Sequence, residues 1–550
     1  MNSFSSKNRQ GLIEQLNNST FDLLIIGGGV TGAGIALDAA ARGLKVALLE
    51  MQDFASGTSG RSTKLIHGGL RYLKQLEFKL VSEVGKEREI IHKIAPHLTR
   101  PETMLLPIFK NGSFNKFSVR LGMWVYEWLA GVKREERHRV LTAAQTLESE
   151  PLLKKEGLLA GVLYYEYRTD DARLTVEVIK EAVARGVQAL NYMRVTGFVY
   201  QGNKINGVTV EDMFAKNTYT IYSARVVNAA GPWVDDLDQM DGAGHGKKLK
   251  LTKGIHLVVD KSKLPVSQSV YFDTADKRMI FVIPREGKTY IGTTDTFYQG
   301  DKIHPQITAE DQAYLLKAVN AYFPRNTLAV SEIESGWAGI RPLINKPGKG
   351  PSEISRKDEL FEWDSGLITI AGGKLTGYRK MAQRVVDTLT KTGRFSSTAG
   401  PLTISECSTD RISLAGRDAT GSFHFPEFVI DKTKEGEELG LSKEEASRLI
   451  YRYGSNVDKI YGYVRDLKQA NYAGELPSWV YAQLLYSVDY ELCTTPCDFF
   501  IRRTGALYFD ISMVRHCKNA LIGTMNQLLG WDEALKKKLA DELQSALDAL

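Results

Sequence analysis

The stretch FDLLIIGGGVTGAGIALDAAARGLKVALLE, from Phe21 to Glu50, decides the fold. An apolar run ends in glycines, a helical pattern follows through IALDAAARG, and a second short apolar run, KVALLE, closes the stretch. This order predicts a strand, a helix and a strand, a unit that places its two strands parallel in one sheet.

The glycines of this stretch have the spacing of a dinucleotide-binding motif. Gly27 allows a tight turn, Gly29 lets a diphosphate approach the backbone, and Gly32 lets the helix pack closely on the strand. Glu50 ends the second strand, at the interval expected of a carboxylate that accepts hydrogen bonds from a ribose. The glycines alone can mark an ordinary turn. With both strands, the helix and the acid in register, they predict an NAD or FAD site, and the acid disfavours a 2′-phosphate.

Two later stretches have the same character. ARVVNAAGP (224–232) and LITIAGGKLTGYRK (367–380) each run from β-branched residues through small residues into a helical pattern. We therefore expect an α/β protein with α+β character, in which a discontinuous, Rossmann-like domain brings these loops to one ligand.

The rest of the chain predicts two further domains. Alternating patterns such as GIHLVVD and RMIFVIPREGKTYIGTTD predict an inserted antiparallel sheet. Helical patterns after Pro401, with a capping-box spacing at Ser442 and Glu445, predict an all-α C-terminal domain. The expected boundaries are 1–100, 165–250 and 345–395 for the cofactor-binding domain, 101–164 and 251–344 for the substrate-binding domain, and 400–550 for the helical domain.

Composition limits the classes of partner. The 550 residues carry a net charge of +6, with Lys and Arg interleaved with Asp and Glu, which argues against nucleic acid. The mild positive charge is compatible with small anions or an anionic membrane surface. The N-terminus MNSFSSKNRQ has no signal-peptide core and no run suits a transmembrane helix, so we expect a cytoplasmic protein with at most peripheral membrane contact.

Three smaller features leave alternatives open. The four cysteines are expected to be reduced thiols, without a zinc site. The aromatic stretch LGMWVYEWLAGV (121–132) could contact a membrane, although core packing of Trp124 and Trp128 is the favoured interpretation. The pair Arg502 and Arg503 could serve a partner, a lipid headgroup or solubility alone.

The segment GTSGRSTKLIHGGLRYL (57–73) gathers hydroxyls, glycines and cations just after the dinucleotide motif. A helix over residues 62–72 would place Lys64, His67 and Arg71 on one face. Hydroxyls and amides nearby could bind the remaining diphosphate and ribityl oxygens, which favours an extended FAD over NAD. A solvated cationic helix would explain the charges but not Gly68 and Gly69 within it.

Seven blocks along the chain resemble the FAD-dependent glycerol-3-phosphate dehydrogenase family: GGGVTGAGIALDAAARG, STKLIHGGLRYL, YRTDDARL, NAAGPW, IGTTD, GIRPL and AGGKLTGYR. The resemblance runs from about Asp22 to Arg379. It implies oxidation of sn-glycerol 3-phosphate to dihydroxyacetone phosphate in glycerol catabolism, by hydride transfer from substrate C2 to flavin N5. It also implies that electrons pass to a membrane quinone, menaquinone or ubiquinone. Related oxidases, which make hydrogen peroxide from oxygen, carry an extra inserted segment that this chain is too short to hold.

The implied reaction assigns roles to cationic residues. Arginine suits a phosphate dianion, because its planar fork binds oxygens bidentately, and Arg71, Arg341 and Arg356 match family positions. His256 in KGIHLVVD is the expected base for the C2 hydroxyl, although a histidine among valines is more often a satisfied core residue. His67 is the rival base and is assigned to flavin contact.

Lys374 and the helix expected from Leu375 would stabilise negative charge on the reduced flavin. Tyr72 and Asp295 are expected to line the substrate pocket, although Asp295 could instead only orient a neighbour. The expected catalytic residues are His256, Arg341 and Lys374, and the expected substrate-binding residues are Arg71, Tyr72, Asp295, Arg341 and Arg356. The expected cofactor contacts are Gly27, Gly29, Gly32, Glu50, Ser59, Ser62, Thr63, Lys64, His67, Gly68, Ala230, Gly231, Gly372, Gly373, Lys374 and Leu375.

Two other functions compete with the dehydrogenase: an oxidase of the same fold, and a non-catalytic flavin-binding module whose helical tail recruits a partner. A homodimer and peripheral attachment to the inner face of the cytoplasmic membrane are both compatible with the sequence.

Overall fold

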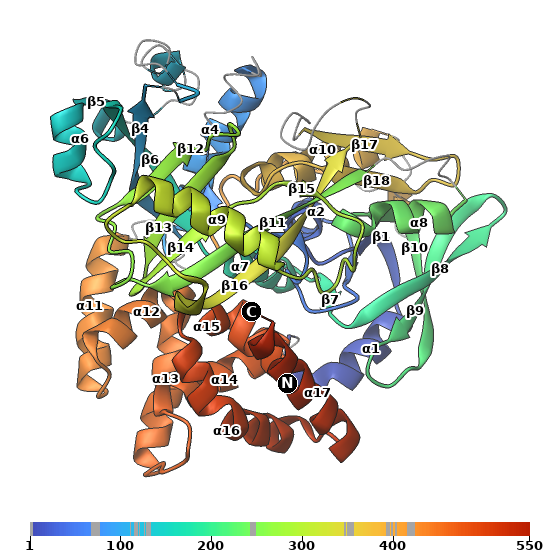
Figure 1. Ribbon diagram of the computed structural model, residues 1–550. Coiled ribbons are helices and arrows are strands. Elements are labelled where there is room, and N and C mark those ends of the chain that lie inside the picture. Colours follow the sequence, from blue (N-terminus) through green and yellow to red (C-terminus); the bar gives the residue numbers. More distant parts are fainter. Residues whose placement is uncertain are drawn as a thin grey trace.

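A computed structural model gives the arrangement of the chain (Figure 1). It describes residues 4–67, 78–110, 112–114, 119, 122–125, 127, 132, 134–242, 249–345, 348, 357–391, 396–397, 400–401, 404–414 and 424–549.

The first sheet joins segments that are far apart in the sequence. β1 (Thr20–Ile26) pairs in parallel with β2 (Val46–Leu49) and with β10 (Thr218–Asn228), and β10 pairs in parallel with β18 (Ile368–Gly372). The three stretches predicted to converge therefore lie on neighbouring strands, which confirms the discontinuous α/β domain. The other strands of this sheet are β7 (Gln188–Leu190), β8 (Met193–Gln201), β9 (Lys204–Asp212) and β17 (Asp358–Glu362).

Helices cover the first sheet closely. α2 (Val30–Ala41) follows β1 and packs against α7 (Asp171–Ala184) and α10 (Tyr378–Lys391). A Cβ on Gly34 of α2 would lie 2.9 Å from the Tyr378 ring, so the two helices approach where no side chain separates them. Because helices shield the parallel strands, β1 reads as a continuous apolar run rather than an alternating one.

The second sheet is antiparallel apart from one parallel pair, β4 with β12. It confirms the predicted inserted sheet, and it also takes in β3, a two-residue strand from the segment after the dinucleotide motif. The boundary expected between residues 164 and 165 falls inside β6. The strands are β3 (Leu65–Ile66), β4 (Thr99–Phe109), β5 (Arg139–Thr142), β6 (Leu158–Thr169), β11 (Leu249–Asp260), β12 (Ser269–Asp273), β13 (Met279–Arg285), β14 (Lys288–Gly292), β15 (Thr296–Phe297) and β16 (Ile333–Ile344).

Short helices flank the two sheets. They include the 3-10 turns η2 (Thr58–Gly60), η4 (Gly231–Trp233) and η6 (Leu375–Gly377). The remaining α-helices of this part are α1 (Arg9–Asn17), α4 (Phe78–Ile94), α6 (Ala143–Ser149), α8 (Val234–Met240) and α9 (Ala309–Tyr322).

The C-terminal part is helical, as predicted, and includes the capping box formed by Ser442 and Glu445. Figure 1 shows these helices grouped beside the second sheet, with both ends of the chain next to them. The helices are α11 (Phe425–Glu438), α12 (Lys443–Tyr453), α13 (Val457–Gln469), α14 (Ser478–Tyr490), a π-helical turn (Asp498–Arg503), α15 (Ala506–Phe509), α16 (Ile511–Leu529) and α17 (Glu533–Asp548).

The helical part shares a core with the second sheet. The Phe509 ring lies 5.9 Å from Trp337 and 5.8 Å from Tyr290, and the Ser335 hydroxyl donates to the Tyr508 carbonyl at 2.5 Å. Arg502 and Arg503 are buried in ion pairs, so the three surface roles considered for them are wrong. Burial of long cationic side chains requires buried acids, which the local sequence does not reveal.

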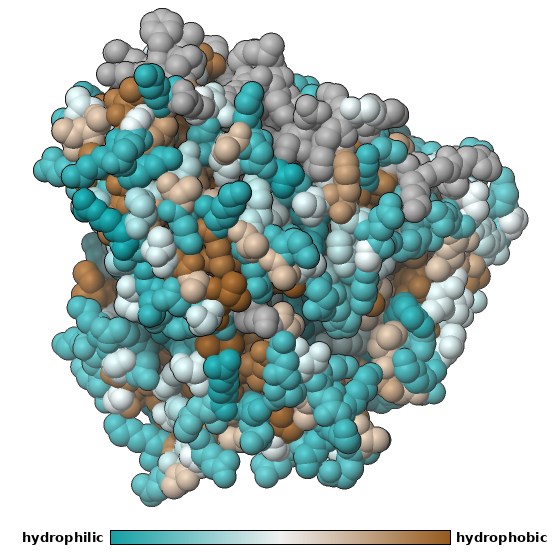
Figure 2. Space-filling model, viewed as in Figure 1, coloured by the Kyte–Doolittle hydropathy of each residue, from teal (hydrophilic) through white to brown (hydrophobic). Residues whose placement is uncertain are grey.

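The surface corrects a second expectation. Trp124 is 62% exposed, so core packing is wrong for this residue, and Trp128 lies outside the described residues. Figure 2 shows apolar side chains lying among hydrophilic ones on the visible face. No helix in the described ranges is long and apolar enough to cross a membrane. All four cysteines are free thiols.

Candidate active site

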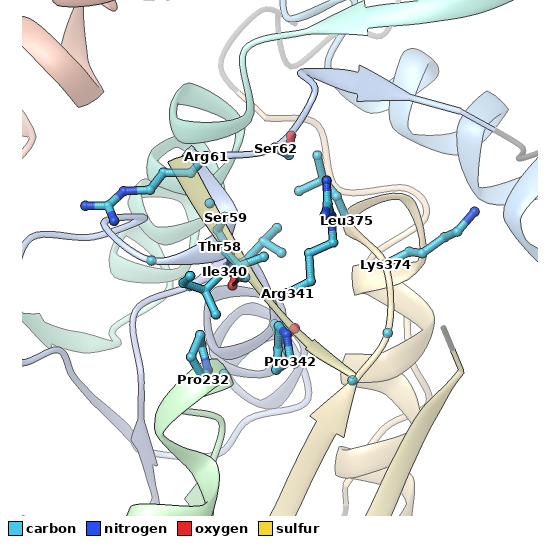
Figure 3. A pocket seen from close by; sticks show the side chains of 18 of the residues that line it. Thr58, Ser59, Arg61, Ser62, Pro232, Ile340, Arg341, Pro342, Lys374 and Leu375 are labelled. Carbon is cyan, nitrogen blue, oxygen red and sulfur yellow. Dashed lines mark hydrogen bonds between the residues drawn. The ribbon is translucent and has the colours of Figure 1, made fainter. Parts of the chain in front are cut away.

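A cavity of about 450 Å³ lies where the loops of the first sheet meet the second sheet. Its walls come from the segments that follow β1, β2, β10 and β18, and from strands β13 and β16 (Figure 3). The cavity therefore brings together most of the residues expected from the sequence. Those that line it are Gly27, Gly29, Glu50, Ser59, Ser62, Thr63, His67, Ala230, Gly231, Asp295, Arg341, Gly372, Gly373, Lys374 and Leu375.

The dinucleotide end of the cavity is made mostly of backbone. Gly27 has a φ of +117°, and a Cβ there would lie 2.5 Å from the Ala229 carbonyl oxygen. A Cβ on Gly32 would lie 1.9 Å from the Gly27 carbonyl oxygen, so this glycine serves packing and does not itself line the cavity. Val30, the first residue of α2, does line it. The first turn of a helix has backbone N–H groups without intrahelical partners, which suit an anionic diphosphate.

Two side chains complete the dinucleotide end. Glu50 accepts the Gly28 N–H at 2.7 Å and the Gln52 N–H at 2.9 Å. Burial raises the pKa of Glu50, and these two backbone hydrogen bonds oppose the shift. The Ser59 hydroxyl oxygen accepts the Val30 N–H at 2.9 Å and so fixes the turn η2 to the start of α2. A carboxylate beside a helix N-terminus and a glycine turn fits the ribose and diphosphate of a dinucleotide such as FAD.

Arg341 lies on β16, in the wall of the same cavity. Its Nη2 donates to the Thr293 hydroxyl at 2.8 Å, and its Nη1 donates to the Thr294 carbonyl at 3.2 Å and lies 3.4 Å from an Asp295 carboxylate oxygen. A Cβ on Gly254 would lie 2.1 Å from Nη2, so the guanidinium lies across bare backbone. Asp295 therefore both lines the cavity and orients its neighbour.

A second arginine lies near Arg341 on the cavity wall. Figure 3 shows the Arg61 and Arg341 side chains extending in different directions. Arg61 Nη1 donates to the Ile303 carbonyl at 3.1 Å, and burial lowers the pKa of Arg61.

His256 on β11 lies behind the cavity wall rather than in it. Its side chain is 1% exposed, and its ring stacks on Trp337 at 4.6 Å with an interplanar angle of 12°. Nε2 lies 3.1 Å from the Thr63 hydroxyl, and Thr63 does line the cavity. Burial, assisted by the charges of Arg341 and Lys64, holds the pKa of His256 well below its usual value. The imidazole is therefore neutral near pH 7 and has a free lone pair, and the same burial makes it a weaker base than an exposed histidine.

The segment after β18 has the geometry expected of it. Gly372 and Gly373 have φ values of +77° and +86°, and a Cβ on Gly372 would lie 2.6 Å from the Lys357 carbonyl oxygen. Lys374 lines the cavity and immediately precedes η6, which leads into α10. A charged side chain and the start of a helix therefore lie at the same place on the wall.

The helix predicted over residues 62–72 is wrong in the part that the structure describes. Residues 65–66 form β3, which pairs with β6. Lys64 has a φ of +57°, and its ammonium lies 2.6 Å from a carboxylate oxygen of Asp171 instead of lining the cavity. Asp171 also accepts both the N–H and the hydroxyl of Ser62. A buried acid on α7, distant in sequence, thus sets the conformation of this segment.

Four expected residues cannot be placed: Gly68, Arg71, Tyr72 and Arg356 lie outside the described residues. Other residues of the site were not expected from the sequence, among them Arg61, which lines the cavity. Thr293 accepts from Arg341 and belongs to the quoted block IGTTD, so that motif could have indicated it. Asp171, which holds the Lys64 segment, likewise belongs to a quoted block, YRTDDARL. Trp337, which stacks on the His256 ring, carries no local signal.

Comparisons with known proteins show which family the chain resembles. Residues 22–379 match the family described as FAD dependent oxidoreductase, and residues 407–536 match the C-terminal domain of alpha-glycerophosphate oxidase. The chain is 52% identical over 544 residues to the aerobic glycerol-3-phosphate dehydrogenase of Bacillus subtilis (strain 168), covering 99% of this chain and 98% of the relative.

Two solved structures are similar. The X-ray structure of the glycerol-3-phosphate dehydrogenase from Bacillus halodurans, complexed with FAD, matches with a TM-score of 0.85 and 47% identity, over 99% of this chain and 98% of that one. The FAD-bound L-alpha-glycerophosphate oxidase from Mycoplasma pneumoniae matches with a TM-score of 0.54 and 20% identity, over 68% of this chain and 95% of that one. The second likeness is one of fold alone.

Proposed function

The chain belongs to the FAD-dependent glycerol-3-phosphate dehydrogenase family, and on that premise we propose how its residues oxidise sn-glycerol 3-phosphate to dihydroxyacetone phosphate. Membership confirms the resemblance carried by the seven sequence blocks, and FAD as the cofactor. The observation that carries the proposal is that Arg341 and the glycine motif, distant in sequence, line one cavity.

FAD supplies the hydride acceptor of the reaction, N5 of its isoalloxazine. The backbone at Gly29 and in the first turn of α2 would lie against its diphosphate, and Glu50 would accept hydrogen bonds from its ribose. Lys374 and the start of η6 would stabilise negative charge on the reduced ring.

Arg341 is the residue proposed to bind the substrate phosphate. Its contacts with Thr293 and Asp295 hold the guanidinium in one orientation before substrate arrives. A fixed planar fork binds phosphate oxygens bidentately and loses little conformational freedom in doing so. Arg71, Tyr72 and Arg356 remain candidates from the resemblance alone.

His256 is the proposed acceptor of the C2 hydroxyl proton. Its neutral ring satisfies the requirement for a base, but its burial places Thr63 between the ring and the cavity. The Thr63 hydroxyl can receive the substrate proton while donating its own to Nε2, which connects the cavity to the imidazole.

Anaerobic turnover with C2-deuterated glycerol 3-phosphate tests the chemistry. We expect one dihydroxyacetone phosphate per bound FAD and slower flavin reduction with the deuterated substrate, because the C2–H bond breaks in that step. Bound FAD that the substrate does not reduce would instead support a non-catalytic flavin-binding module.

The electron acceptor and the membrane contact are separate parts of the proposal. We expect the reduced enzyme to be reoxidised by a soluble quinone analogue faster than by oxygen, with little hydrogen peroxide per turnover. Stoichiometric peroxide would favour the oxidase. Fractionation of lysates tests peripheral attachment, and a protein that stays wholly out of the membrane fraction and gains no activity from added lipid would argue against it.

A further inference from the structure

A buried ionic cluster joins the C-terminal helical part to the loop that follows Glu50. We call it the Asp53 cluster. Arg503 donates to the two Asp53 carboxylate oxygens at 2.7 and 2.9 Å, and Arg502 donates to the same carboxylate and, at 2.6 Å, to Asp498. Asp53, Asp498 and Arg503 are at most 1% exposed, and Arg502 is 8% exposed. The members are Asp53, Asn191, Glu491, Asp498, Arg502 and Arg503.

The loop that carries Asp53 is bound directly to the dinucleotide motif. The Ala55 N–H donates to the Gly28 carbonyl at 3.1 Å, and Ala55 has a φ of +60°, which residues other than glycine rarely adopt. A Cβ on Gly60 would lie 2.4 Å from the Ala55 carbonyl oxygen. Displacement of this loop would therefore move both the glycine turn and the turn η2 that carries Ser59.

The connection between β7 and β8 also holds Glu50 and the loop after it. The Met193 N–H donates to the Glu50 carbonyl at 2.7 Å, and the Tyr192 N–H donates to the Gln52 carbonyl at 2.9 Å. The Asn191 amide donates both to Asp53, at 2.9 Å, and to the Leu492 carbonyl, at 3.0 Å. Asn191 thus connects the loop to the segment that precedes the π-helical turn.

The buried charges of the cluster restrict it to one geometry. A buried carboxylate must be paired and hydrogen-bonded, and Asp53 meets two guanidinium groups and an amide. Arg503 also donates to the Glu491 carbonyl at 2.8 Å, so each partner is held from several directions. Such a cluster tolerates few alternative arrangements, whereas apolar side chains of the same volume would let the loop shift.

We propose that Asp53, Arg502 and Arg503 are positioning residues, through which the C-terminal helical part holds the loop after Glu50 in the shape that binds FAD. The inference rests on the proposed function only in taking the dinucleotide to be FAD. None of the three residues lines the cavity, so they act through Glu50, Gly28 and Ser59.

FAD affinity of the apoprotein tests the proposal. We expect Asp53→Asn to weaken FAD binding, measured by quenching of FAD fluorescence, by about 10- to 100-fold, by analogy with the loss of metal affinity when a group that orients a metal ligand is removed. Arg503→Lys keeps the charge but loses the two-oxygen contact, so it should weaken FAD binding less than Arg503→Met does.

Gln483→Leu is the matched control. Gln483 is 1% exposed on α14, where its side-chain oxygen accepts from Arg452 at 2.7 Å and from Tyr453 at 3.2 Å, within the C-terminal helical part rather than at the loop after Glu50. The substitution should lower the melting temperature without changing FAD affinity. Equal losses of FAD affinity in Gln483→Leu and Asp53→Asn would show general destabilisation and overturn the proposal.

Two further measurements keep the test decisive. Circular dichroism of the apoproteins reports whether each variant folds, and if Asp53→Asn does not fold, Arg503→Lys decides. Once saturated with FAD, the folded variants should be reduced by glycerol 3-phosphate at close to the wild-type rate, since no cavity residue has changed. Unchanged FAD affinity in folded Asp53→Asn would refute the positioning role, whereas failure of the wild type to be reduced would refute only the proposed function.

Discussion

One part of the cavity wall, the dinucleotide end, is mostly backbone, and another part, the cationic end, is mostly side chains. The dinucleotide end comes largely from one continuous stretch, in which Gly27, the start of α2 and Glu50 follow one another along the chain. At the cationic end, Arg341 and His256 come from two paired strands, and Lys374 comes from the loop after β18. A site that binds its ligand through backbone groups keeps most of its affinity when one side chain is removed. A site that binds through side chains loses a contact with each side chain that is removed. Substitutions at the cationic end should therefore stop turnover while FAD stays bound, and those at the dinucleotide end should mainly weaken FAD binding.

Arg341→Ala should have the largest effect. We expect kcat/KM for glycerol 3-phosphate to fall about 10²- to 10⁴-fold, because two charge-assisted hydrogen bonds to phosphate, each of about 1.5–3 kcal/mol, are lost. Steady-state kinetics and the FAD content of the purified protein measure this. Arg341→Lys, which keeps the charge without the planar fork, should fall in between. If Arg341→Ala lost FAD in proportion to its loss of activity, the cationic end would also be required for FAD binding, and the two ends would not differ in the way described.

His256→Asn should lower the rate of flavin reduction about 10²- to 10³-fold, as expected for loss of a general base. The pH dependence sharpens this prediction. Because burial lowers the pKa of His256 well below its usual value of 6.5, the wild-type ring stays neutral as pH falls through 6.5. The acid limb of kcat/KM should therefore lie well below pH 6.5. If kcat/KM instead falls off at or above pH 6.5, the base is a group other than His256.

Glu50→Gln should act at the dinucleotide end. The amide keeps the shape of the side chain, but it has only one oxygen, whereas each of the two carboxylate oxygens now accepts one backbone N–H. One of these hydrogen bonds is therefore lost, together with the charge that faces the ribose. We expect FAD to bind about 10-fold more weakly, from roughly 1.5 kcal/mol for a charged hydrogen bond. Calorimetric titration of the apoprotein with FAD measures this. If FAD-saturated Glu50→Gln fails to turn over, Glu50 has a role beyond binding.

Ser59→Ala should have the smallest effect. The Val30 N–H loses its acceptor, and loss of such a cap costs about 1 kcal/mol, which corresponds to roughly fivefold in FAD affinity. Ser59→Thr, which keeps the hydroxyl, is the control and should bind FAD almost as the wild type does. An effect as large as that of Arg341→Ala would mean that this end is no more tolerant than the other.

The sequence predicted those parts whose geometry is local. The strand, helix and strand of residues 20–49 follow from apolar runs and glycines that act on their immediate neighbours. Arg341 and His256 were found through motifs of a resembling family, and the pairing of β11 with β16 places them on neighbouring strands. The segment around Lys64 was misjudged, because pairing with β6 and a buried aspartate outweigh its helical spacing. Arg503 was misjudged for the same reason, since its partner Asp53 is distant in sequence.

The proposed function requires one cavity whose backbone end binds FAD and whose cationic end binds the substrate phosphate. The most direct test adds glycerol 3-phosphate, and separately glycerol, to the FAD-loaded protein without oxygen while the visible flavin band is recorded. We predict rapid bleaching by glycerol 3-phosphate and almost none by glycerol, because only the ester carries the group that Arg341 binds. Equal bleaching by both compounds, or an unchanged spectrum with glycerol 3-phosphate, would contradict it.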